Sequence, residues 1–270
     1  MIKIRQAFST QRVENIPSAT EKELAGLQLN SRIRAGDTVA VTAGSRGISE
    51  IALITRTVID ALRKLGAKPF IIPAMGSHGG STAQGQMEVL AKYGITEARM
   101  GVPIKSSMEV VDLGMSPYGL PIFIDKSASE ADHIVIINRI RTHTLFSGRI
   151  ESGLTKMLLV GMGNQKAAET YHRAVLEYPF DEIVLNTVPI LLQKLSVLFG
   201  LAIIENARGE VAELEAVLPQ QFLEREPELL ERSISLTAKL PFDETDLLVV
   251  DEMGKDISGT GMDTSIIGKK

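Results

Sequence analysis

Strand-like and helix-like segments alternate along most of this chain, and that alternation limits the folds it can adopt. Apolar runs with the length of a buried strand fall at residues 37–42, 68–74, 110–113, 122–124, 133–138, 199–205 and 247–251. Apolar residues recur at helical spacing at 49–65, in the segment that follows the loop at 76–82 and ends near residue 93, and at 155–160, 165–176, 183–195 and 220–239. The last of these is interrupted near Pro227. The pattern predicts an α/β fold: a Rossmann-like, mostly parallel sheet flanked by helices.

The composition excludes several classes of function. A net charge of −4 gives no electrostatic reason to expect a nucleic acid or an anionic membrane as a partner, and the apolar runs are too short to span a bilayer. Because the chain has no cysteine, disulfides, thiolate metal ligands and thiol nucleophiles are ruled out, and a cytoplasmic location is the default. His133 begins an apolar run and matches no motif, so we expect it to be structural.

A glycine-rich turn follows the first strand-like run and contains Gly44, Ser45, Arg46 and Gly47. Such a turn can bind a pyrophosphate at a helix N-terminus, which would suit an NAD(P)-dependent oxidoreductase. However, none of the four tyrosines is followed by a lysine four residues later, the pair that a short-chain dehydrogenase would need. The turn is otherwise an ordinary tight connection, or one in which Arg46 grips a carboxylate or phosphate with two hydrogen bonds.

The segment 141–173 is the richest in chemically useful side chains. Sixteen residues separate Lys156 from His172, and the Gly-Met-Gly break at 161–163 lets two helices turn back on each other, so the two side chains could face one another. Apolar neighbours would desolvate Lys156, lower its pKa and favour covalent chemistry. The alternative is a lysine that merely extends its amine from an apolar helix face to solvent.

An ordered set of motifs in this chain resembles the lactate racemase family, and most closely its shorter relatives. The motifs are GSHG at 76–79, TH at 142–143, FSG at 146–148, ESGLTKM at 151–157 and GMG at 161–163, followed by His172. The family's cofactor is a nickel-pincer nucleotide: a pyridinium ring with two thio-acyl arms, one of them linked to a lysine. Nickel binds the ring carbon, both sulfurs and one histidine. The resemblance implies that Lys156 is the attachment lysine and His172 the nickel ligand.

The resemblance also implies the remaining roles. It places the two acid/bases at His78 and His143, the substrate-binding residues at Arg46 and Lys255, and further cofactor-binding residues at Gly44, Ser45 and Gly153. In this chemistry a histidine takes the hydroxyl proton of a 2-hydroxy acid while hydride moves from its carbon to the cofactor ring. The keto acid then receives hydride on its other face, so one histidine serves each enantiomer.

The predicted function is therefore a racemase or epimerase of a 2-hydroxy acid, with cofactor-maturation enzymes as partners; a homo-oligomer is compatible with it. Two alternatives stay open: the NAD(P)-dependent oxidoreductase, and a non-catalytic fragment that binds a small anion or nucleotide. Family members usually continue well beyond the last motif. We therefore assign residues 1–240 to a lactate-racemase-like N-terminal domain and 241–270 to a closing segment or the start of a second α/β lobe, incomplete at its C-terminal end.

Overall fold

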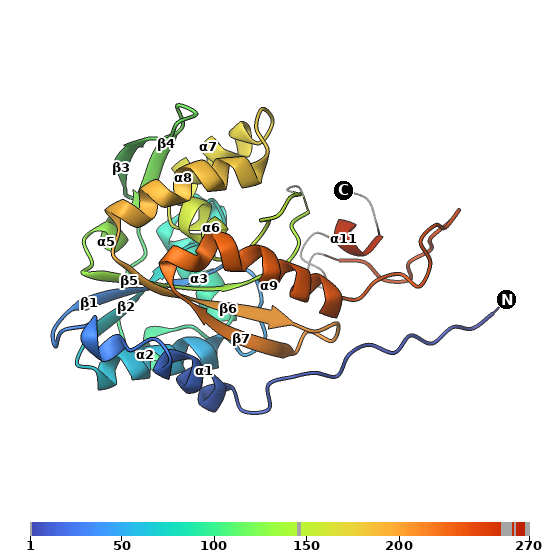
Figure 1. The fold of residues 1–270 in the computed structure, drawn as a ribbon, viewed down its shortest axis with the longest axis horizontal. Helices are drawn as coiled ribbons and strands as arrows, with labels where there is room; N and C mark the ends of the chain where they lie inside the picture. The colour runs from blue at the N-terminus through green and yellow to red at the C-terminus, as the bar shows by residue number, and fades with distance from the viewer. Residues whose placement is uncertain (1, 145–146, 255–260, 262, 268–270) are drawn as a thin grey trace.

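The computed structural model describes residues 2–144, 147–254, 261 and 263–267. A five-stranded sheet runs through its centre in the order β2-β1-β5-β6-β7 (Figure 1). Its strands are β1 (Thr38–Ala43), β2 (Lys68–Pro73), β5 (His133–Arg139), β6 (Val197–Glu205) and β7 (Val211–Val217). The first four are parallel and β7 is antiparallel to β6. The predicted α/β fold with a mostly parallel sheet is confirmed.

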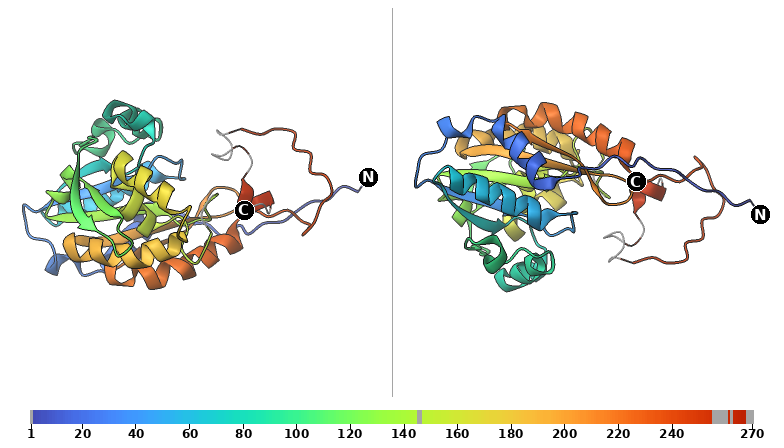
Figure 2. Two further views of the ribbon diagram at one scale, coloured as in Figure 1. Left: turned by 90° about the horizontal axis from the view of Figure 1, so that it is seen from above. Right: turned by 90° about the horizontal axis from the view of Figure 1, so that it is seen from below.

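Helices cover both faces of this sheet, as Figures 1 and 2 show. One face carries α1 (Ile16–Ala25) and α2 (Ile51–Lys64), and the other carries α6 (Leu154–Lys156), α7 (Asn164–Ala174), α8 (Phe180–Lys194) and α9 (Phe222–Leu236). Strand residues alternate between the two resulting cores: Ala40 of β1 belongs to the α6–α9 core, whereas Val39 and Val41 belong to the α1–α2 core. None of the described helices combines the length and the apolar character needed to cross a bilayer.

Smaller elements surround the sheet. A separate antiparallel hairpin, β3 (Val110–Met115) and β4 (Pro121–Asp125), packs through β4 against α7. The other described helices are α3 (Ala83–Lys92), α4 (Glu97–Met100), α5 (Lys126–Ser129), α11 (Thr264–Ile267) and three 3₁₀ turns at Leu29–Ser31, Gly79–Ser81 and Pro219–Gln221.

Two expectations from the sequence are wrong. Residues 247–251 form no strand: in the described part of the chain the run pairs with no other strand, and Leu247 is 80% exposed. An apolar run needs a neighbour to become a strand, and no such neighbour is encoded in the run itself. The helix containing Pro227 is not interrupted, but continues from Phe222 to Leu236. Proline removes one hydrogen bond from this helix, and the burial of Leu229 and Leu230 stabilises the helix despite that loss.

The strand order places a topological switch point between β1 and β5. From β1 the chain passes through α2 to β2 on one side, whereas β5 lies on the other side of β1. Loops that leave the carboxyl ends of these strands diverge there, and in open α/β sheets this is where ligands bind.

Candidate active site

Loops at the carboxyl ends of β1, β2 and β5, with the two helices that follow β5, gather titratable side chains at the switch point. We call this set the basic cluster: Arg46 after β1, His78 after β2, Arg141 and His143 after β5, Lys156 on α6 and His172 on α7. Their proximity shows in their electrostatics: burial is the main cause of the lowered pKa of the histidines and the lysine, and cations of the cluster lower each of these pKa values further. The structure therefore brings five predicted site residues together and adds Arg141.

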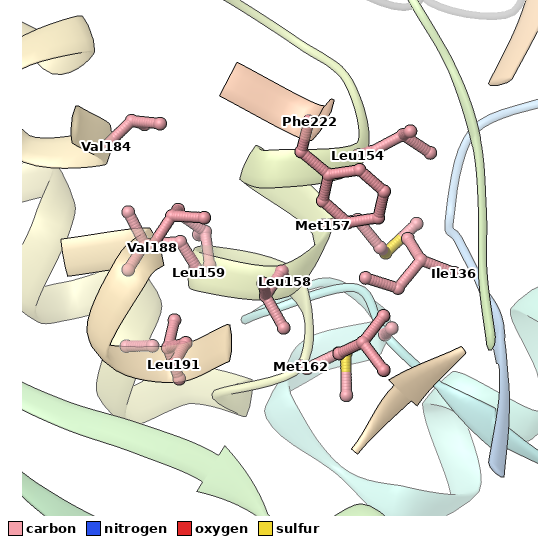
Figure 3. Packing of buried hydrophobic residues seen from close by; sticks show 14 of the residues in the cluster. Ile136, Leu154, Met157, Leu158, Leu159, Met162, Val184, Val188, Leu191 and Phe222 are labelled. Carbon is pink, nitrogen blue, oxygen red and sulfur yellow. The ribbon is translucent and has the colours of Figure 1, made fainter. Parts of the chain in front are cut away.

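The helix that carries Lys156 continues into a buried π-helical turn. Directly after α6 the chain makes a π-helical turn, Met157–Gly161, in which all five residues are buried. Figure 3 shows side chains of this turn lying among residues of α8, α9 and β5: Val184, Val188, Leu191, Phe222 and Ile136. Single π-helical turns inserted in helices occur often at functional sites. The apolar packing fixes the backbone from which the lysine side chain extends.

The amine of Lys156 is biased toward its neutral form. Burial, together with the positive charges of Arg46 and Arg141, lowers its pKa to about 8. At pH 7 about a tenth of such amines are neutral, whereas an ordinary lysine is neutral in well under a thousandth of molecules. Since the neutral amine is the nucleophilic form, this lysine is a better nucleophile near neutral pH than an exposed lysine.

The three histidines of the cluster are held neutral near pH 7. Burial, assisted by the cluster's cations, lowers the pKa of His143 to about 3. Burial and nearby positive charge also lower the pKa of His78 and of His172. Neutral imidazole is the form that accepts a proton or binds a metal ion. Nδ1 of His78 contacts Oγ of Ser45, so Nε2 is the nitrogen that would meet a ligand.

Two acidic residues that the sequence reasoning missed support these loops. Glu151 is buried, and one of its oxygens (Oε2) accepts a hydrogen bond of 2.6 Å from the backbone N–H of His143. Glu205, at the end of β6, forms an ion pair with Arg139 and accepts a 2.6 Å hydrogen bond from the backbone N–H of Ser49. Each carboxylate thus fixes the backbone of a loop that carries a cluster residue. The sequence contained a signal for both residues, since Glu205 ends a predicted strand and Glu151 lies within the ESG motif.

The glycine-rich turn differs from a dinucleotide-binding turn. Helix α2 begins only at Ile51, and Glu50, with φ +56°, occupies the position before it. A carboxylate there would repel a pyrophosphate at the helix N-terminus. Arg46 itself is exposed, and the carbonyl of Ser45 accepts a 3.1 Å hydrogen bond from the hydroxyl of Tyr93. An ideal Cβ at Gly44 would lie 3.1 Å from Cε of Met157, so this turn packs on the lysine-bearing segment.

Gly153 is buried directly before α6. Its carbonyl accepts a 2.7 Å hydrogen bond from the side-chain amide of Asn138, and an ideal Cβ on it would lie 2.2 Å from Oε1 of Glu226. Glycine is therefore required at this position by packing. Its contact with a cofactor stays a prediction.

We expect Gly153→Ala to lower the free energy of unfolding by about 3 kcal/mol, because the added methyl must displace the buried Glu226 carboxyl or Ile140. Urea unfolding would measure the loss. Ser152→Ala, at the half-buried neighbouring position, is the matched control and should change stability by less than about 0.5 kcal/mol. Equal stabilities for the two variants would contradict the packing described.

The C-terminal segment is described only in part. Lys255 lies outside the described residues. Asp263 is buried and forms an ion pair with Arg141, and the hydroxyl of Thr264 lies 3.5 Å from the carbonyl of Thr144. The described end of the chain thus contacts the loop that carries His143.

His133 lies at the opposite, amino-terminal edge of the sheet. Its Nδ1 is 2.9 Å from Oγ of Ser196 and its Nε2 is 3.1 Å from Oδ2 of Asp37. Both partners directly precede strands, so the ring ties the starts of three strands together. These contacts are structural, as expected.

Within the described residues, no three histidine, aspartate or glutamate side chains are placed to hold a metal ion together. A metal at the basic cluster would therefore take most of its donors from a bound cofactor. His172 is exposed and neutral near pH 7, so it can offer one ring nitrogen. The residues present fit a metal-bearing cofactor held by one lysine and one histidine.

Comparisons with known proteins show the family and the fold of this chain. The family model of the lactate racemase N-terminal domain matches residues 5–182. The solved structure of the lactate racemase apoprotein from Thermoanaerobacterium thermosaccharolyticum matches with a TM-score of 0.60 and 16% sequence identity, over 84% of this chain and 57% of that chain. This chain therefore spans little more than half the length of that relative, and the likeness shows a shared fold. No curated protein matches the sequence.

Proposed function

Because this chain belongs to the lactate racemase N-terminal domain family, we propose that it is a racemase or epimerase of a 2-hydroxy acid and that it uses a nickel-pincer nucleotide linked to Lys156. The convergence of the basic cluster at the switch point is the observation that carries this proposal. A lysine with a pKa of about 8 lies there beside neutral histidines, which is the combination that the chemistry requires.

When bound, the nucleotide supplies the hydride acceptor for an unactivated C–H bond. Lys156 would carry the cofactor through Nζ, and His172 would give nickel one ring nitrogen. Arg46, exposed at the edge of the cluster, would bind the substrate carboxylate and fix its orientation. We propose that Lys255 shares that role, and that Gly44 and Ser45 lie along the cofactor.

The acid/base histidines would move the hydroxyl proton. For one enantiomer His78 would accept it at Nε2, since Nδ1 faces Ser45, and for the other enantiomer His143 would accept it. When hydride returns to the opposite face of the keto acid, the other histidine would donate a proton to that oxygen, so each histidine is base for one enantiomer and acid for the other. Two bases on opposite sides of one carbon are what a racemase needs, because each enantiomer presents its hydroxyl group differently.

Attachment through Lys156 would also change the electrostatics of the cluster. In the free protein the positive charge of Lys156 contributes to the lowered pKa of both His78 and His143. A neutral linkage at Nζ removes that charge. Loss of that charge alone would raise the pKa of both histidines, whereas burial, the largest cause of their lowered pKa, would remain.

The test is racemisation of lactate and other 2-hydroxy acids, deuterated at carbon 2, by protein produced with cofactor-maturation enzymes. We expect His78→Asn and His143→Asn each to lower kcat at least about 100-fold and to leave the mass adduct on Lys156 intact. Deuterium should stay on carbon 2, because it moves as hydride and does not exchange with solvent.

His133→Asn is the matched control, since this histidine lies at the far edge of the sheet, and it should keep its activity. Survival of racemisation in both cluster variants would overturn the two-base mechanism. Loss of deuterium to water would indicate proton abstraction at carbon in place of hydride transfer.

A further inference from the structure

We propose that Glu226 is a positioning residue for Lys156: from α9 it holds the first turn of the helix that carries the lysine, and so determines where Nζ lies within the basic cluster. The functional importance of this position rests on the proposed function, in which Lys156 carries the cofactor. The contact itself joins residues 71 positions apart in the chain.

The hydrogen bonds of Glu226 all go to the start of α6. Its Oε2 accepts a 2.9 Å hydrogen bond from the backbone N–H of Thr155, and its Oε1 lies 2.9 Å from the Thr155 hydroxyl. The backbone N–H of Leu154 also donates to it. Lys156 is the next residue, so the carboxyl group fixes the two peptide units that precede the lysine.

The start of α6 has no capping side chain of its own. Gly153 occupies the cap position in an extended conformation and offers no side chain to the first N–H groups of the helix. Those groups need acceptors when they are buried. Glu226 supplies the acceptors from another element, and a side chain at Gly153 would collide with it. Residues 153–155 are thus shaped around a single carboxyl group.

Burial of a carboxyl group at position 226 carries a large desolvation cost. The side chain of Glu226 is 1% exposed and lies on the buried face of α9 beside Leu229 and Leu230. An apolar side chain would fill this place at a lower desolvation cost, because a buried carboxyl needs its hydrogen bonds to offset the loss of water. Unlike an apolar residue, the carboxyl accepts hydrogen bonds from the start of α6.

The test is competitive acetylation of the purified, cofactor-free protein over a range of pH, with the labelled Lys156 peptide measured by mass spectrometry. In the wild type, Lys156 should titrate near its lowered pKa of about 8. In Glu226→Ala the freed turn lets Nζ reach solvent, so we expect labelling of Lys156 at pH 8 to fall about fivefold, because a pKa one unit higher lowers the neutral fraction from about a half to about a tenth. Exposed lysines such as Lys166 provide the internal reference.

Glu226→Gln should restore the wild-type profile, because its amide oxygen can accept from Thr155 N–H and its NH₂ group can donate to the hydroxyl. Leu230→Ala, which removes apolar packing from α9 but none of the hydrogen bonds between Glu226 and Thr155, should leave the profile unchanged. An unchanged profile in folded Glu226→Ala, or an equal shift in Leu230→Ala, would overturn the proposal. If Glu226→Ala does not fold, Thr155→Val takes its place, with a smaller shift in the same direction expected and no shift contradicting the proposal.

The labelling needs no cofactor and no substrate. A failure of the positioning role therefore appears in the profile of Lys156, whereas a failure of the proposed function appears as a missing adduct or missing racemisation. The two outcomes are distinguishable within one set of variants.

Discussion

Lys156→Arg is expected to abolish covalent loading of the nickel-pincer nucleotide, and racemisation with it, while the protein still folds. Arginine keeps the positive charge and most of the length of the side chain, but its guanidinium stays protonated and cannot form the neutral linkage. In the wild type, burial and two neighbouring arginines lower the pKa of Lys156 to about 8, so a reactive amine is available near neutral pH. Intact mass after production with the cofactor-maturation enzymes, followed by peptide mapping, measures the adduct.

Three controls make this result interpretable. Lys166→Arg changes an exposed lysine on α7 and should load normally. His172→Ala should keep the adduct and lose nickel, which separates attachment from metal binding. A lactate racemase produced in parallel must carry the adduct. An adduct elsewhere in Lys156→Arg would contradict the assignment of the lysine, and an unloaded wild type beside a working control would favour a fragment that binds a small anion or nucleotide.

The sheet could be predicted because its signal is local. Strands β1, β2, β5 and β6 are short apolar runs between helical segments, and each was predicted to within a few residues. Strand β7 was missed although its residues alternate in character and a turn at 206–209 precedes it. Its two half-buried carboxylates, Glu213 and Glu215, pair with arginines of α9, and these charged residues made an edge strand resemble a polar loop segment. The apolar run at 247–251 shows the opposite error, because local character does not provide a partner strand.

The candidate site likewise contains residues that the local sequence predicts and one, Glu226, that it does not. Residues in loops after strands could be predicted to converge, since the carboxyl ends of parallel strands meet at one edge. Glu226 could not be placed, because its partner Thr155 lies far away in the sequence and the residues around Glu226 are mostly charged. A signal was nevertheless present: Glu226 falls on the same helical stripe as Phe222, Leu230 and Ser233, all buried. An acidic residue on an apolar stripe indicates a specific buried partner.

The cost of burying Glu226 should be visible as a pH dependence of stability that Glu226→Gln removes. Burial raises the pKa of Glu226 to about 7 from an ordinary 4.5. Below pH 4.5 the group is protonated in both the folded and the unfolded state. Between these values the folded protein keeps a proton that the unfolded chain releases, so the group's contribution to stability is lost progressively as the pH rises through about 7. The full difference is about 3 kcal/mol.

Glu226→Gln has no such titration. At pH 8 it should therefore be more stable than the wild type by about 2 kcal/mol, after about 1 kcal/mol is allowed for a weaker hydrogen bond, and at pH 4, where only that weaker bond counts, it should be less stable by about 1 kcal/mol. Urea unfolding of both proteins across this range measures the difference, in which the titration of all other groups cancels. Glu231→Gln, exposed on the same helix, is the control and should follow the wild type at every pH. If the free energies of unfolding of Glu226→Gln and the wild type changed in parallel with pH, burial of this carboxyl would not destabilise the fold. The expected divergence would mean that Glu226, the residue that holds the helix carrying Lys156, lowers the stability of the wild type at neutral pH.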